Sequence, residues 1–151
     1  MMISTQEKLK KLYEIDDSLW LEKIINLLKE NRLNELDLDN LIEELESLGK
    51  RDKLAVSSLL EQIMRHLLLI EFWENEYDRN YRHWKAEITG FRNQLNKGLT
   101  TNLKNFLIHS LDEIYQDALE YVETKSNLNI FPLQCPYTIE QLLDKNWFPE
   151  R

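Results

Sequence analysis

Apolar residues recur at helical spacing over most of this chain, and the longest run lies between residues 38 and 70. At about 100° per residue its members fall on one side of a helix. They are Leu38, Leu41, Ile42, Leu45, Leu48, Val56, Leu59, Leu60, Ile63, Leu67 and Ile70. The pattern keeps its phase across Gly49, and a helical glycine costs only about 1 kcal/mol. We therefore predict one long helix from Leu38 to about Glu74.

The alternative is a helical hairpin that breaks at Gly49. Glycine commonly follows the last turn of a helix. Asp52 falls inside the apolar stripe, where it would suit the N-cap of a second helix better than a core position.

Shorter segments show the same spacing next to residues that cap helices. Predicted helices span about residues 5–13, 17–30, 78–97, 101–125 and 139–143, and a polar connector spans residues 74–76. Only three Gly and three Pro occur, and Leu, Glu, Lys, Asn and Asp dominate, which favours helix over sheet. The fold class is therefore all-α, an antiparallel bundle of four to five helices. An extended C-terminal segment containing proline and a short final helix complete it.

The length of 151 residues fits a single helical domain over residues 1–151. Residues 1–15 would form an N-terminal arm or helix. Residues 126–151, which include Pro132 and Pro136, would form a tail that packs on the bundle.

The net charge of −8 and the pI near 5.0 argue against general binding to nucleic acid or to anionic membranes, since both are polyanions. No apolar run approaches the roughly 20 residues of a membrane span. The N-terminal residues lack the apolar core of a signal peptide. We therefore expect no membrane contact and a cytoplasmic location. Cys135 is the only cysteine, which rules out an internal disulfide and a cysteine-based zinc site.

Several segments occur in an order that resembles a known family. They are LYEIDDSLWLEKIINLLKENRLNELDLDNLIEELESLG, RHLLL, the positions of Trp84, Ile88 and Arg92, and FPLQCPYTIEQLLD. The chain resembles the bacterial, largely cyanobacterial, family called domain of unknown function number twenty-nine. The resemblance implies an all-helical fold and no assigned activity. The family pattern matches at Glu43, Glu44, Glu46, His66, Trp84 and Arg92. The chain departs from it near His83 and Glu87, where small hydroxyl residues are expected.

The candidate site residues are His66, Glu44, Glu46 and Arg92. Glu44 and Glu46 lie on opposite flanks of the apolar stripe, so they do not converge, and a solvated helix face explains them. His66 lies on the stripe itself. It is either a structural histidine bonded to a carbonyl or carboxylate, or a general base or metal ligand. In a continuous helix Glu44 and His66 would be about 33 Å apart, so His66 would need a partner from another helix.

No cofactor and no metal ion are expected. The three histidines do not have the spacing of zinc or di-iron sites, and an exposed pair explains His83 and Glu87. The predicted helix 78–97 is basic. Its positive residues were expected to face away from the aromatic stripe: Arg79, Arg82, Lys85, Arg92 and Lys97.

Three functions follow as hypotheses. The first is a protein–protein interaction or regulatory module, adaptor or antitoxin-like, without catalysis, whose partner is another protein or a second copy. The second is a small hydrolase or metal-dependent enzyme that uses His66 with a carboxylate. The third, nucleic-acid binding through helix 78–97, has the least support because stacking on bases would require exposed aromatic residues.

Overall fold

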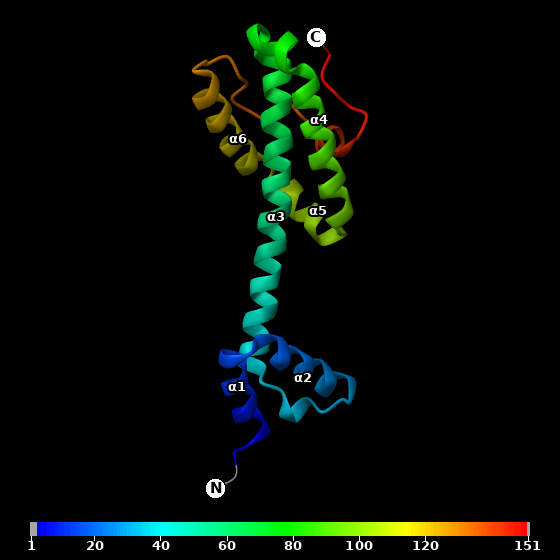
Figure 1. The fold of residues 1–151 in the computed structure, drawn as a ribbon. Helices are drawn as coiled ribbons and strands as arrows, with labels where there is room; N and C mark the ends of the chain where they lie inside the picture. The colour runs from blue at the N-terminus through cyan, green and yellow to red at the C-terminus, as the bar shows by residue number, and fades with distance from the viewer. Residues whose placement is uncertain (1–2, 151) are drawn as a thin grey trace. The chain divides into compact units, whose positions relative to one another are not determined.

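The computed structural model describes residues 3–150, and every regular element in this range is helical (Figure 1). In chain order the elements are α1 (Thr5–Ile15), α2 (Asp17–Lys29), the 3-10 helix η1 (Leu33–Glu35), α3 (Leu38–Phe72), α4 (Glu74–Gly98), α5 (Thr101–His109), α6 (Leu111–Ser126) and α7 (Ile139–Leu143). The predicted all-α class is therefore confirmed.

The chain forms two compact units, unit 1 (Met1–Arg51) and unit 2 (Asp52–Arg151). Helix α3 contributes its first part to unit 1 and the remainder to unit 2. It runs through Gly49 without a break, which confirms the long helix and rejects the hairpin. The single domain over residues 1–151 stays a prediction.

Unit 1 is held by two helix caps and a small core. The Ser4 hydroxyl accepts a hydrogen bond from the N–H of Glu7, and Asp16 accepts one from the N–H of Leu19. These side chains satisfy amides that have no partner within the first turn of each helix. The core consists of Leu9, Trp20, Ile24, Leu27 and Leu36, with Leu12, Tyr13 and Leu41 packed against it.

Asp37 connects α2 to the beginning of α3. It is fully buried and directly precedes Leu38. The indole N–H of Trp20 donates to its carboxylate at 3.2 Å, and the Asn40 amide donates to the same oxygen at 2.6 Å. The positive end of the α3 dipole favours a negative charge at this place. The Asp37 carbonyl accepts the N–H of Leu41, so Asp37 marks where α3 begins.

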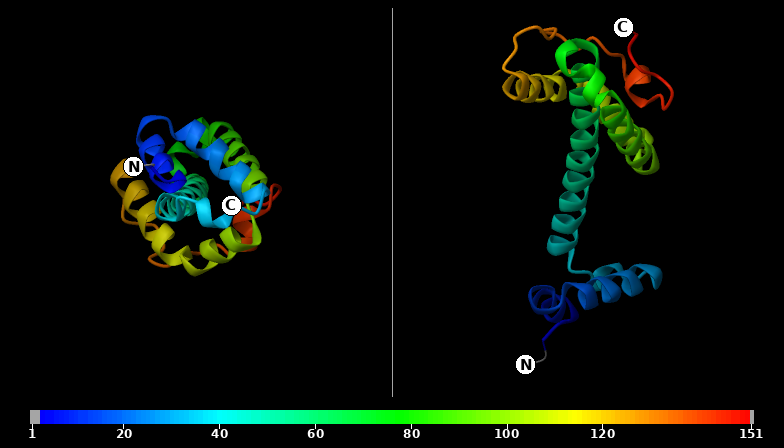
Figure 2. Two further views of the ribbon diagram at one scale, coloured as in Figure 1. Left: turned by 90° about the horizontal axis from the view of Figure 1, so that it is seen from below. Right: turned by 45° about the horizontal axis from the view of Figure 1, so that its top comes forward.

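In unit 2, helices α4, α5 and α6 surround the second half of α3 (Figures 1 and 2). Helix α3 supplies the centre of the core, where Leu60, Ile63 and Leu67 are completely buried. The opposing apolar side chains come from α4, α5 and α6: Trp84, Ile88, Leu95, Leu107, Ile114, Tyr115, Ala118, Leu119 and Val122. The helical spacing that predicted this part of the α3 stripe therefore corresponds to a real core.

Two predicted element boundaries were wrong. Residues 74–76 are the first turn of α4 rather than a connector, and the break falls at Trp73 (φ −93°, ψ 75°). Glu74 and Glu76 are favourable there because the helix dipole stabilises acids in a first turn. The predicted helix 101–125 is divided at Ser110 into α5 and α6. Serine competes for main-chain hydrogen bonds and tolerates such a break.

The tail packs on unit 2. Phe131, Tyr137, Ile139 and Leu142 are buried in the unit 2 core, and Trp147 packs on Tyr137 with ring centroids 5.7 Å apart. Helix α7 begins with a capping box in which Thr138 and Gln141 each bond the main chain of the other.

Arg92 binds this tail, and its expected place on a solvated face was wrong. The side chain is fully buried and donates to the carbonyls of Leu142 (2.9 Å), Trp147 (2.7 Å) and Gln141 (2.9 Å). Burial lowers the pKa of Arg92 to about 10, so the guanidinium is still charged at neutral pH. The tail covers a side of α4 that the pattern of α4 alone left open to solvent.

The first part of the α3 stripe was also misassigned. Leu38, Ile42, Leu45 and Leu48 are 53%, 51%, 59% and 51% exposed. We call these four residues the α3 apolar face. Only Leu41, on the edge of the same stripe, packs against the unit 1 core. Helical spacing identified the apolar side of α3, but unit 1 does not cover that side.

We predict that Arg92→Met destabilises the protein by about 3 kcal/mol, because three carbonyls lose a charged donor that methionine cannot replace. Urea unfolding followed by circular dichroism measures this. Arg79→Met is the matched control, since Arg79 lies on the same helix and is exposed. An Arg92→Met variant that unfolds at the wild-type urea concentration would contradict the role given to Arg92.

Candidate functional site

The four candidate residues do not form one site. Glu44 and Glu46 belong to unit 1, whereas His66 and Arg92 belong to unit 2. The contacts of each candidate lie within its own unit. Each is therefore described in its own surroundings.

Glu44 binds Tyr13. The Tyr13 hydroxyl donates to the Glu44 carboxylate at 2.5 Å, and this bond, assisted by burial, raises the pKa of Tyr13 to about 12. The other Glu44 oxygen lies 4.0 Å from the Arg51 guanidinium. Glu46 and Glu43 are exposed. Glu44 thus connects α1 to α3 at the edge of the α3 apolar face, and the neighbouring acids face solvent.

His66 lies half-buried on α3. Its Nδ1 is 2.7 Å from the carbonyl oxygen of Gln62, one turn earlier. Because a carbonyl only accepts, Nδ1 carries the proton and the Nε2 lone pair remains available. The Phe91 ring lies against the imidazole at 5.5 Å between centroids. Burial lowers the pKa of His66 and outweighs the opposing effect of the Gln62 bond, so the ring is neutral at pH 7.

A cavity of about 410 Å³ opens beside His66. Side chains of α3, α4 and α6 line it, among them Trp73, Glu76, His83, Trp84 and Lys125. Trp73 and Trp84 stack at 6.0 Å and form its apolar wall. The hydrolase hypothesis needs a carboxylate in hydrogen-bond contact with His66, but the bond found for this imidazole goes to a main-chain carbonyl. The site therefore offers a neutral base beside a cavity, without the carboxylate that would orient it.

Metal binding finds no matching geometry in residues 3–150, where no group of three or more His, Cys, Asp or Glu side chains is placed to hold an ion. His83 lines the His66 cavity, and the negative charge of Glu87 raises the pKa of His66 slightly. The charges of these two residues therefore have opposite effects on the pKa of His66: Glu87 raises it and His83 lowers it.

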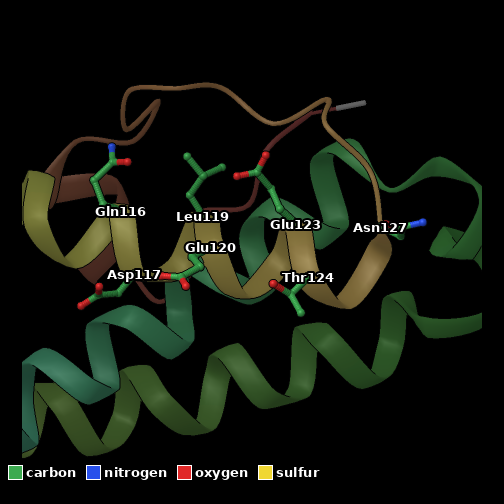
Figure 3. Close-up of a pocket in the computed structure, with 7 residues that line it drawn as sticks. All are labelled: Gln116, Asp117, Leu119, Glu120, Glu123, Thr124 and Asn127. Atoms are coloured by element: carbon green, nitrogen blue, oxygen red, sulfur yellow. The ribbon is translucent and has the colours of Figure 1, made fainter.

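A surface depression of about 710 Å³ lies along α6 (Figure 3). Three acids line it, Asp117, Glu120 and Glu123. Figure 3 shows Glu123 and Leu119 projecting to one side of α6, and Asp117 and Glu120 to the other. All seven lining residues come from α6 or its C-cap Asn127. The depression is therefore the acidic face of one helix, and it does not combine side chains from different elements.

Comparison with known proteins identifies the family. The model of the family described as Domain of unknown function DUF29 matches residues 12–148. The chain belongs to this family. No curated protein and no solved structure matches the DUF29 chain. None of its helices within residues 3–150 is long and apolar enough to cross a bilayer.

The sequence contains a signal for the burial of Arg92 that the aromatic stripe of α4 does not show. Arg92 is four residues after Ile88 and three before Leu95, which is the spacing of one helix face. Ile88 and Leu95 are both completely buried. An arginine between two core positions of the DUF29 chain should therefore have been read as buried and bonded.

We predict that the low pKa of His66 makes folding less favourable in mild acid. Unfolding returns the imidazole to its ordinary pKa of 6.5, so the unfolded chain takes up a proton that the folded chain does not. This contribution to stability is complete above pH 6.5 and is lost as the pH falls through the lowered folded pKa. Urea unfolding between pH 5 and pH 7.5 should show a shallower pH dependence for His66→Gln than for wild type.

His109→Gln is the matched control for this measurement. His109 makes the same bond, 2.7 Å to the carbonyl oxygen of Asn105 four residues earlier, but from an exposed position. It should change the pH dependence less than His66→Gln. Equal changes in the two variants would show that burial of His66 is not the cause.

Proposed function

We propose that this DUF29 protein is a non-catalytic interaction module, an adaptor or regulator that docks a helix of a protein partner on the α3 apolar face. The exposure of Leu38, Ile42, Leu45 and Leu48 carries this proposal. Four large apolar side chains at the spacing of one helix side form a surface that a second helix can pack against.

The exposed apolar residues are concentrated in unit 1. Eleven of the sixteen exposed large hydrophobic residues of the described chain lie between residues 3 and 48. Burial of a Leu or Ile side chain is worth roughly 1.5–3 kcal/mol, so leaving this many in water forgoes considerable stabilisation. Single exposed leucines are ordinary, but an aligned group of this size is typical of a docking surface.

The alternatives receive less support. The hydrolase would use His66 with a carboxylate, and His66 instead bonds the Gln62 carbonyl. Nucleic-acid binding would use the basic side of α4, and Arg92, one of its five cations, is buried against the tail. Lys85, a second, lies over the rings of Phe148 and Tyr81. The α3 apolar face has no such competing use within the described chain.

Photo-crosslinking from defined positions tests the proposal. Benzoylphenylalanine replaces Leu45 or Leu48 in the full chain, and Leu133, which is 76% exposed in the tail, is the matched control position. We expect one protein species to crosslink at positions 45 and 48 and not at 133. Excess wild-type chain should compete with this product, whereas a Leu45→Ser/Leu48→Ser chain should not. Absence of crosslinks at both α3 positions, or the same products at all three, would overturn the proposal.

A further inference from the structure

The α3 apolar face is flanked by acids before Leu48 and by bases after it, and the exposed Asp52 follows these bases on the stripe itself. Glu44 and Glu46 precede Leu48, and Lys50 and Arg51 follow it. At 100° per residue, Glu44 and Arg51 are about 20° apart on one flank of the face. Glu46 and Lys50 are about 40° apart on the other flank. Each flank therefore changes sign from negative to positive along α3.

This arrangement is self-complementary in one orientation only. We propose that the partner on the α3 apolar face is α3 of a second copy of this chain, paired antiparallel about a two-fold axis beside Leu48. The inference rests on the proposed function and names its partner. Antiparallel pairing places Glu44 opposite Arg51 of the second copy and Glu46 opposite Lys50 of the second copy. The two-fold axis repeats both pairs, as in any isologous interface.

Parallel pairing would give the opposite result. It brings residues at the same level together from opposite flanks, so Glu44 would meet Glu46 of the second copy and Arg51 would meet Lys50 of the second copy. Like charges beside an apolar seam repel, and flanking charges of this kind set the orientation of paired helices. The same four side chains thus favour the antiparallel pair and disfavour the parallel one.

Gly49 supplies an independent observation. It lies on the same side of α3 as Leu45, in the middle of the helix, where glycine is about 1 kcal/mol less favourable than alanine. A Cβ at this position would meet no atom within 4 Å, and its φ is not positive, so neither packing nor backbone conformation within the chain requires glycine. Beside the two-fold axis, a missing side chain lets the two helices approach closely.

One oxygen of Glu44 keeps its bond from the Tyr13 hydroxyl, and the other oxygen is available for the new pair. The bond between Glu44 and Arg51 within one chain is long, 4.0 Å, and both side chains are partly in water. Lys50 and Glu46 are exposed. Antiparallel pairing therefore exchanges the weak contact between Glu44 and Arg51 for pairs with the second copy, and it covers Leu45 and Leu48 with the same residues of the second copy.

Sedimentation equilibrium of the full chain tests the inference. The wild type should dimerise with increasing concentration. Glu44→Lys/Glu46→Lys and Lys50→Glu/Arg51→Glu should each weaken dimerisation by roughly tenfold or more, because each sets like charges opposite one another. The variant with all four changes should regain the dimer. Glu14→Lys/Glu22→Lys is the matched control for Glu44→Lys/Glu46→Lys, with the same change in net charge on exposed residues of unit 1.

Gly49→Ala is expected to change monomer stability and dimer affinity in opposite directions. It should raise the helix content or thermal stability of the monomer and weaken the dimer. Simple misfolding would lower both.

A wild type that stays monomeric at all concentrations, or a dimer indifferent to either charge reversal, would overturn the inference. If crosslinks from position 45 still join another protein, the proposed function stands and only its partner is wrong. If crosslinks from positions 45 and 48 are absent as well, both fail.

Discussion

The guanidinium of Arg92 organises the C-terminal part of the chain. A buried cation is costly unless its donors are satisfied, and Arg92 satisfies them with three main-chain carbonyls of the tail. No carboxylate bonds it within the described chain, although the negative charge of Asp144 raises its pKa a little. The tail residues from 141 to 147 must therefore keep one path across α4, since any other path leaves the charge in the core without partners.

This constraint explains the order of packing around the tail. With residues 141–147 fixed, Leu142 enters the core of unit 2, and Phe148 lies over the Arg92 guanidinium at 5.1 Å. Tyr137 reaches back to Glu71 on α3, and burial is the main reason that its pKa is raised. Trp147 and Phe148 thus pack against the core of unit 2.

Periodicity predicted the core that the second half of α3 forms with α4, α5 and α6. The α3 stripe from Leu60 to Ile70 and the caps at Ser4 and Thr138 are local properties that the sequence predicts. For α2 and α5 the sequence offered two neighbouring caps each, and the structure uses Asp16 and Thr100. Periodicity failed at Arg92, because the contact joins residues about fifty positions apart. It also failed for Leu38 to Leu48, because spacing shows which side of a helix is apolar and not what covers it.

The candidate site illustrates the same limit. The sequence left two roles open for His66, and the bond to a main-chain carbonyl is one of them. Neither role predicted the cavity whose apolar wall is Trp73 and Trp84. A histidine within a helix often donates to the carbonyl one turn earlier, and both His66 and His109 do so. This bond fixes the tautomer, but it uses the nitrogen that a catalytic carboxylate would need for orientation.

The exposure of Arg92 and of the α3 apolar face was misassigned, and the two groups differ in whether the chain itself covers them. Arg92 is a polar residue that shares the helical spacing of the buried residues of α4, and the tail of the chain covers it. The α3 apolar face shares the helical spacing of the buried residues of α3, but unit 1 leaves its four side chains exposed to water: Leu38, Ile42, Leu45 and Leu48. The cover proposed for these residues is α3 of a second copy, and it is argued from the reversal of charge around Leu48.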